Sequence, residues 1–171
     1  LDVLFSKQDV QCFGETSGSA SVLVDGGQSP YTYLWSNNQI TETAIYLSSG
    51  YHVVSVTDAN GCIQVDSIFI DSPEELQIVS NQSNISCYGI NEGNINITID
   101  GGTFPYETLW STGDTSQQIN NLSSGNYNVL VTDNSNCTKQ QFFNIYEPEP
   151  LEAVINYSEF VCSYDNGNGW A

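Results

Sequence analysis

Five cysteines carry the most definite chemistry in this chain, and they stand at positions 12, 62, 87, 137 and 162. One constant shift along the chain places Cys12 on Cys87, Cys87 on Cys162, and Cys62 on Cys137. This shift is called the repeat period below. Thiols at such regular spacing predict either disulfides or a metal site. Zinc is disfavoured, because the chain has no Cys-x-x-Cys pair and a single histidine.

Disulfides are therefore the simpler interpretation of these thiols. One bond within each repeat period predicts the pairs Cys12–Cys62 and Cys87–Cys137, with the partner of Cys162 beyond residue 171. A bond that closes a loop of this length stabilises the fold by about 4 kcal/mol at most. Disulfides of this kind indicate a protein that works outside the cytoplasm.

Acidic residues dominate the charge, since 20 Asp and Glu face two Lys and give a formal net charge of −18. Binding to nucleic acids or anionic membrane surfaces needs clustered positive charge, so neither is expected. No apolar run approaches the ~20 residues of a membrane span, so direct membrane insertion is not expected either. A negative field attracts cations, and calcium is the cofactor that hard oxygen ligands favour. The candidate calcium ligands are Asp58 with Asn60 and Asp133 with Asn134, and the alternative is that these residues shape turns while the charge keeps the protein soluble.

Catalytic groups are scarce in this sequence. A Ser-His-Asp arrangement would have to use His52, but Tyr127 occupies the equivalent position one repeat period later. The sequence also has no phosphate-binding glycine loop and no EF-hand loop. We therefore expect no enzymatic activity from this chain.

The repeat period aligns the whole chain without a gap, and not only its cysteines. The recurring pieces are Asp-Gly-Gly, Pro-Tyr, Leu-Trp-Ser, Leu-Ser-Ser-Gly and Val-Thr-Asp. We therefore expect a first repeat at residues 1–73, a second at residues 76–148, and the start of a third at residues 151–171. Short acidic linkers that contain proline separate them, and such linkers are stiff.

Each repeat has the residue pattern of β-strands. Residues 94–99 alternate strictly between polar residues and isoleucine, and residues 31–35, 53–57 and 63–70 are short β-branched or aromatic runs. No window has a helical period, and turn residues separate the runs. About six or seven strands per repeat predict an all-β chain of tandem immunoglobulin-like antiparallel β-sandwiches. Tyr127 is expected to form a tyrosine corner, which His52 weakens or rebuilds in the first repeat.

These motifs together resemble a known family, the SprB repeat. The string comprises Cys12, Gly26-Gly27, Pro30-Tyr31, Trp35-Ser36, Leu47 to Gly50, Val56-Thr57-Asp58 and Cys62, and it recurs one repeat period later. The resemblance implies a sandwich similar to the polycystic-kidney-disease type of immunoglobulin-like domain. It also implies a repeat of a very large cell-surface protein of Bacteroidota, such as the gliding-motility adhesin that names the family, exported by type IX secretion. Proteins of that group carry O-linked glycans at Asp-Ser/Thr followed by an apolar residue or Thr, so the resemblance makes Ser67 a candidate glycosylation site.

The resulting functional prediction is a non-catalytic stalk module of a large secreted surface adhesin or filament. Its expected partners are the neighbouring repeats of the same chain, and surface glycans or other surface proteins. Two sandwiches joined by a stiff linker predict an elongated rod of roughly 60–80 Å. Two alternatives stay open: a ligand-binding module that uses exposed tyrosines such as Tyr31 and Tyr33, and an accessory repeat of a secreted enzyme. Flanking sequence would distinguish them, because many further repeats favour the stalk and a catalytic domain favours the accessory role.

Overall fold

Alternating side chains decide which face of each strand is buried. In the segment Gly93–Asp100, Ile95 and Ile97 are almost inaccessible, whereas Asn96 and Thr98 beside them are exposed. This is the pattern of a strand with one face on a core and the other in water. The computed structural model describes residues 1–156, and all of their regular structure is β.

Each repeat contains six strands. Repeat 1 (residues 1–73) has β1 (Asp2–Gln8), β2 (Gly18–Asp25), β3 (Thr32–Trp35), β4 (Thr43–Leu47), β5 (Gly50–Thr57) and β6 (Ile63–Ile70). Repeat 2 (residues 76–148) has β7 (Gln77–Ser83), β8 (Gly93–Asp100), β9 (Tyr106–Trp110), β10 (Gln118–Leu122), β11 (Gly125–Asp133) and β12 (Thr138–Ile145). The third repeat predicted for residues 151–171 lies mostly outside the described residues, and residues 151–156 carry no strand.

The strands of each repeat form a sandwich, and the two sandwiches have the same topology. In repeat 1 one sheet has the order β1-β2-β4 and the other β3-β5-β6, and every pairing is antiparallel. Repeat 2 has the equivalent sheets β7-β8-β10 and β9-β11-β12. The prediction of an all-β chain of immunoglobulin-like antiparallel sandwiches is confirmed.

One tryptophan lies at the centre of each core. Trp35 and Trp110 are each only 2% exposed, and their indole N–H groups donate to the carbonyl oxygens of Thr41 and Ser116 at 2.9 and 2.8 Å. Such an acceptor removes the cost of burying the indole N–H, so that burial of the large ring stabilises the core. Both sheets of a repeat supply the residues around the tryptophan, so each repeat has a core of its own. The buried side chains of repeat 1 are Val10, Ala20, Val22, Trp35, Ala44, Leu47, Val54, Val56 and Ile70.

The connection between β3 and β4 decides at which end of the sandwich β5 and β6 begin. Both strands run in the same direction but lie in different sheets, because residues 36–42 cross from one sheet to the other without forming a strand. β3 and β4 together therefore cross the length of the sandwich once. β2 and β5 each cross it once more, so the chain crosses three times between the start of β2 and the end of β5. β5 therefore ends at the end of the sandwich opposite to the one at which β2 begins.

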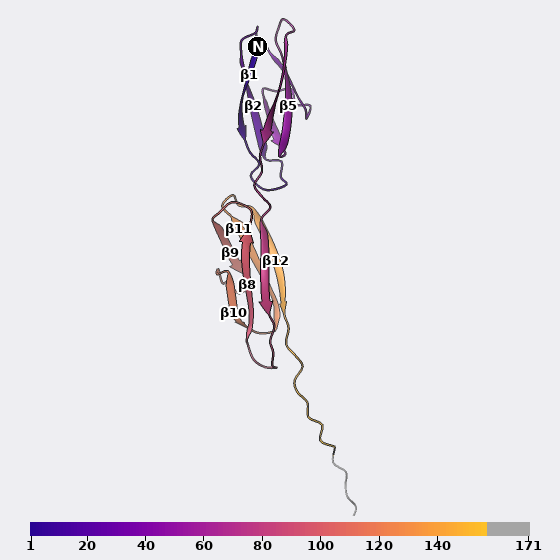
Figure 1. Cartoon of the computed structure of the whole chain (residues 1–171), viewed down its shortest axis with the longest axis vertical. Helices are drawn as coiled ribbons and strands as arrows, with labels where there is room; N and C mark the ends of the chain where they lie inside the picture. Colours follow the sequence, from indigo (N-terminus) through magenta and orange to yellow (C-terminus); the bar gives the residue numbers. More distant parts are fainter. Residues whose placement is uncertain (157–171) are drawn as a thin grey trace, which may run out of the picture.

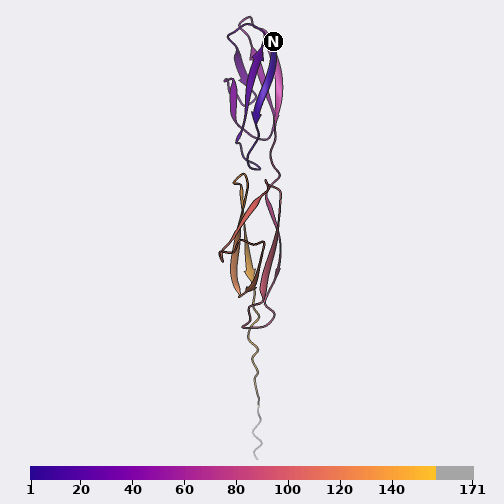
Figure 2. The ribbon, with the colours of Figure 1, turned by 90° about the vertical axis from the view of Figure 1, so that its left-hand side faces the viewer.

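Two poles can be defined for each sandwich. The proximal pole is the end at which the chain enters the repeat, and the distal pole is the end from which it leaves. Figures 1 and 2 show repeat 1 and repeat 2 one after the other along the longest axis, so the distal pole of repeat 1 faces the proximal pole of repeat 2. The junction of these two poles is called the joint below.

Candidate functional site at the joint between the repeats

The two cysteines of repeat 1 lie at opposite poles. Cys12 follows β1 at the distal pole, where the N–H of Val10 donates to the carbonyl of Asp71 at 2.9 Å. Cys62 directly precedes β6, at the proximal pole. The whole of β6, about 25 Å at ~3.4 Å per residue, separates the two ends. Repeat 2 has the same arrangement, since the N–H of Ile85 donates to the carbonyl of Tyr146 at 2.9 Å.

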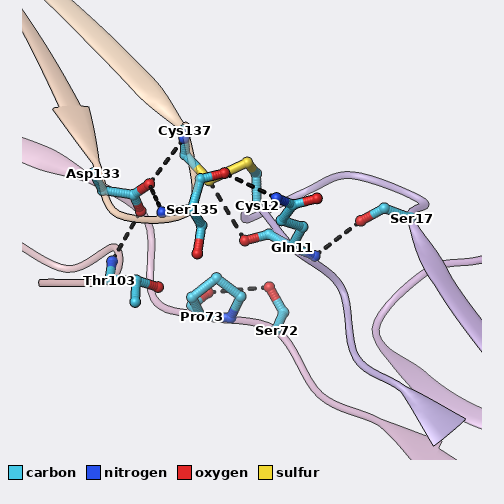
Figure 3. Close-up of a disulfide and its surroundings, with 9 residues drawn as sticks. All are labelled: Gln11, Cys12, Ser17, Ser72, Pro73, Thr103, Asp133, Ser135 and Cys137. Carbon is cyan, nitrogen blue, oxygen red and sulfur yellow. Dashed lines mark hydrogen bonds between the residues drawn. A yellow bond between two sulfur atoms is a disulfide. The ribbon is translucent and has the colours of Figure 1, made fainter.

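The predicted pairs Cys12–Cys62 and Cys87–Cys137 are therefore wrong. A disulfide needs Cα atoms within about 4.4–6.8 Å of each other, and the length of a strand lies between the two cysteines of each repeat. The structure instead joins Cys12 of repeat 1 to Cys137 of repeat 2, with an S–S distance of 2.07 Å and a Cα–Cα distance of 5.6 Å (Figure 3). Cys62 and Cys87 are free and exposed at the outer poles. Cys162 lies outside the described residues.

An aspartate holds the loop that carries Cys137. One carboxylate oxygen of Asp133 accepts the backbone N–H groups of Ser135 and Cys137, both at 2.8 Å, and the other accepts the N–H of Thr103 at 2.8 Å (Figure 3). Asp133 is only 4% exposed, so its charge is stabilised by these amides rather than by bulk water. These three hydrogen bonds to Asp133 are called the aspartate clasp. They fix the backbone of the β11–β12 loop and thereby the position of Cys137.

Asp58 makes the same clasp in repeat 1. It accepts the N–H groups of Asn60 and Cys62 at 2.9 and 2.8 Å on one oxygen and that of Gln28 at 3.1 Å on the other. The N–H of Cys62 is the largest cause that lowers the pKa of Asp58; burial opposes this shift, and the other two amides add to it. The loop of the free Cys62 is therefore organised like the loop of the bonded Cys137.

Polar contacts across the joint accompany the disulfide. The Gln11 side chain of repeat 1 donates its Nε2–H to the carbonyl of Ser135 in repeat 2 at 3.0 Å (Figure 3). The carbonyl oxygen of Gln11 also lies 3.4 Å from Sγ of Cys137. A groove beside these contacts is lined by both repeats, with Cys12, Phe13 and Glu15 on one side and Leu76, Cys137 and Lys139 on the other.

The linker, residues 71–76 between β6 and β7, is hydrogen-bonded to both sandwiches. At repeat 1 the N–H of Asp71 donates to Asp9 at 2.7 Å, and at repeat 2 the N–H of Gly102 donates to the carbonyl of Glu74 at 2.9 Å. Lys139 binds Glu75 at 2.9 Å, and this hydrogen bond is the main cause that lowers the pKa of Glu75. The linker therefore has little freedom to swing.

A close approach of backbones also fixes the joint. Gly101 has a φ of +69°, and a Cβ atom built there would lie 2.0 Å from the carbonyl oxygen of Glu75. A side chain at this position would push the linker away from repeat 2. Glycine is therefore required here both for its conformation and for the space that it leaves.

The candidate calcium ligands are not gathered around an open site. Asp58 and Asp133 already bind backbone amides with both oxygens, while the N–H of Asn134 donates to the carbonyl of Thr103 at 2.9 Å and Asn60 is exposed. Within residues 1–156 no group of three or more His, Cys, Asp or Glu could hold a metal ion. The structure thus gives these aspartates a definite role in shaping loops, and calcium binding stays a prediction.

His52 and Tyr127 perform the same structural task. The hydroxyl of Tyr127 donates to the carbonyl of Ser123 at 3.0 Å, which makes the predicted corner. In repeat 1, Nε2 of His52 lies 2.9 Å from the carbonyl of Ser48, at the equivalent position. Histidine therefore rebuilds the corner with a different ring, and this explains its presence without catalysis.

The remaining candidate residues fall into two groups. Tyr31 and Tyr33 are half-buried; the hydroxyl of Tyr31 donates to the carbonyl of Gly26 at 2.8 Å, and burial is the main cause that raises the pKa of Tyr33. Both therefore support the fold of repeat 1. Ser67, the candidate glycosylation site, is exposed on β6 at the edge of its sheet, where a modifying enzyme could reach it.

Comparison with known proteins agrees with the repeat motifs. The family model described as "SprB repeat" matches residues 4–40 and residues 79–115. One region in each repeat is therefore similar to the SprB repeat, which supports the resemblance given by the sequence motifs. SprB repeats and immunoglobulin-like sandwiches are non-catalytic types of module, and SprB repeats occur in surface-exposed proteins.

Two further comparisons complete this result. No curated protein matches the chain. A solved structure titled "Structure of amphioxus IgVJ-C2 molecule" is similar at 12% sequence identity with a TM-score of 0.33, covering 82% of this chain and 95% of that one. No helix in residues 1–156 is long and apolar enough to cross a membrane.

Proposed function

We propose that this chain is a stalk segment of a large secreted surface adhesin or filament, and that it holds a distal region away from the cell. The disulfide Cys12–Cys137 carries the proposal, because it joins two sandwiches end to end and not within themselves. A bond at this place fixes the direction in which one repeat follows the other. Control of direction is what a spacer requires.

Three further properties support a stiff, exported spacer. The linker is bonded to both poles, so bending would break hydrogen bonds on both sides. A net charge of −18 makes the repeats repel each other, which favours extension over folding back. A disulfide also fits an oxidising location outside the cytoplasm. The similarity to the SprB repeat supports export by type IX secretion to the surface of a Bacteroidota cell, with a part in adhesion or gliding.

Small-angle X-ray scattering of the full chain tests the proposal. A rod of two sandwiches should have a maximum dimension of at least roughly 60–80 Å, since each contributes about 25–35 Å. Its radius of gyration should lie well above the ~16 Å of a compact fold of this length. The profile should stay extended at both low and moderate salt, because the joint holds the shape even where salt screens the charge repulsion. A compact profile at either salt concentration would refute the stalk.

A further inference from the structure

The two free cysteines are equivalent, by the repeat period, to the two bonded ones. Cys87 occupies the distal pole of repeat 2 as Cys12 does in repeat 1, and Cys62 occupies the proximal pole of repeat 1 as Cys137 does in repeat 2. We propose that both are half-sites for disulfides to neighbouring repeats: Cys87 bonds the proximal-pole cysteine of the repeat that follows, and Cys62 the distal-pole cysteine of one that precedes. This inference rests on the proposed function and deepens it, because every joint of the stalk would then be covalently closed.

The half-site at Cys62 is already shaped for this bond. Asp58 binds the N–H groups of Gln28, Asn60 and Cys62 at the positions where Asp133 binds those of Thr103, Ser135 and Cys137. Cys62 is also exposed, so a partner can approach it.

The half-site at Cys87 has a corresponding organisation. In the bonded half-site the N–H of Gln11 donates to the Ser17 hydroxyl oxygen at 2.8 Å. In the free half-site the N–H of Ser86, the equivalent residue, donates to the Glu92 carboxylate at 2.6 Å. The side chain at one repeat position, Ser17 or Glu92, therefore holds the backbone next to the cysteine in both loops. Ser86 is too short to make the contact that the Gln11 side chain makes across the joint, so the next joint depends more on its disulfide.

The linker beyond repeat 2 can present the next repeat in the same way. Glu147-Pro148-Glu149-Pro150-Leu151 follows the pattern of Ser72-Pro73-Glu74-Glu75-Leu76, with proline and glutamate at equivalent positions. The Glu74 carbonyl accepts the N–H of Gly102 in the joint, and Glu149 is its equivalent in the linker after repeat 2. A following repeat would thus find the Glu149 carbonyl, equivalent to that of Glu74, as a hydrogen-bond acceptor beside Cys87.

The bond forms by oxidation of two thiols. A disulfide-containing oxidant accepts two electrons as the Cys87 thiolate attacks it and releases one thiolate of the oxidant. The thiolate of the neighbouring repeat then attacks the sulfur of Cys87 in this mixed disulfide and releases the second. Two protons leave with the two electrons, and the oxidant ends as a dithiol or as two thiols.

The test protein is the full 171-residue chain followed directly by a copy of residues 97–150. Because residue 171 is equivalent to residue 96, this copy completes the third repeat. It also supplies a copy of Cys137 at the proximal pole of that repeat. The protein is refolded with reduced and oxidised glutathione, alkylated, digested without reduction and mapped by mass spectrometry. We expect Cys12–Cys137 and Cys87 bonded to the copied Cys137, with Cys62 and Cys162 alkylated. The matched control replaces the copied cysteine by serine, and Cys87 should then be alkylated as well.

A second chain keeps the test decisive if the third repeat of the first chain does not fold. It carries a complete copy of residues 76–150 after Pro150, so that its third repeat has the sequence of repeat 2. The proposal is overturned if Cys87 is alkylated in this chain while Cys12–Cys137 forms, or if Cys87 pairs with any other cysteine. Either result would leave the scattering test of the 171-residue chain untouched, so failure of the disulfide series and failure of the stalk can be told apart.

Discussion

The joint and the outer poles contain the same residues in different states. At the joint, Cys12 and Cys137 are bonded, while Cys87 and Cys62, their equivalents at the outer poles, are free. The local structure does not account for this difference, because the clasp of Asp58 matches that of Asp133. What differs is that the joint brings two poles together within residues 1–156. The disulfide in this part of the chain therefore belongs to the joint and not to a repeat.

Removal of the joint disulfide should have the largest effect on this comparison. The bond closes a loop with a sequence separation of 125, and the chain-entropy treatment gives about 5 kcal/mol of stabilisation as an upper value for such a loop. Cys12→Ser should therefore lower the midpoint of urea unfolding strongly. The control Cys62→Ser removes a free thiol and should change the free energy of unfolding by less than about 0.5 kcal/mol. Equal shifts in the two variants would contradict the assignment of the bond.

The aspartate clasps should have the next largest effect. Asp133→Ala leaves three backbone N–H groups without their acceptor in a buried loop, and we expect a loss of about 2–3 kcal/mol. It should also slow formation of the Cys12–Cys137 bond during refolding, because the loop no longer holds Cys137 in place. Asp58→Ala should destabilise repeat 1 but leave the rate of that bond unchanged. Disulfide formation followed by quenched alkylation measures this, and a slower rate in both variants would disprove a local role.

Acid should weaken the clasp of repeat 1 in a defined pH range. The pKa of Asp58 is lowered from its ordinary value of 3.8, so the folded state binds the proton less tightly than the unfolded chain does. The stability that Asp58 contributes is therefore complete above about pH 4 and is lost as the pH falls through the folded-state pKa. Thermal melts between pH 7 and pH 2.5 should show a smaller loss below pH 4 for Asp58→Asn than for the unchanged chain. Parallel curves would mean that Asp58 does not titrate in this way.

Calcium should have the smallest effect. Each carboxylate of Asp58 and Asp133 already accepts three backbone amides, so a cation would have to compete with them for the same oxygens. Calcium that binds the folded state at these aspartates should therefore raise the melting temperature over that in chelator only slightly, by about 1–2 °C. An unchanged melting temperature would count against the calcium binding that the acidic composition predicts.

Much of the fold could be predicted from the sequence, because the signals are local. Strict alternation in residues 94–99 marks β8, and the tryptophans after Pro-Tyr mark the cores. The cysteine pairing could not be predicted in this way. It depends on whether residues 36–42 form a strand, since one additional traverse would have brought Cys12 and Cys62 to the same pole. No residue pattern in that segment reveals that the chain changes sheets there, and the simpler pairing within a repeat is wrong for that reason.

The site residues show the same limit. Asp58 and Asp133 stand out as recurring acids, but carboxylates that bind calcium and carboxylates that bind amides have the same sequence signature. The distinction needs the positions of the N–H groups, which belong to the loop itself and to a neighbouring loop earlier in the chain. The histidine is easier to interpret, since its equivalent Tyr127 points to a corner.

The disulfide also gives the molecule a short covalent route under tension. A pull applied at Leu1 and Pro150 need not follow the whole chain between them, because it can cross from Cys12 to Cys137 through the sulfur atoms. That route consists of residues 1–12 and 137–150, about 90 Å when fully stretched, whereas the unbridged chain could extend to roughly 500 Å. β1 and β12 would carry the force along their own lengths, and the strands between them would be shielded. A surface filament made of such segments would transmit a sudden pull as a nearly inextensible tether and would not lengthen by unfolding.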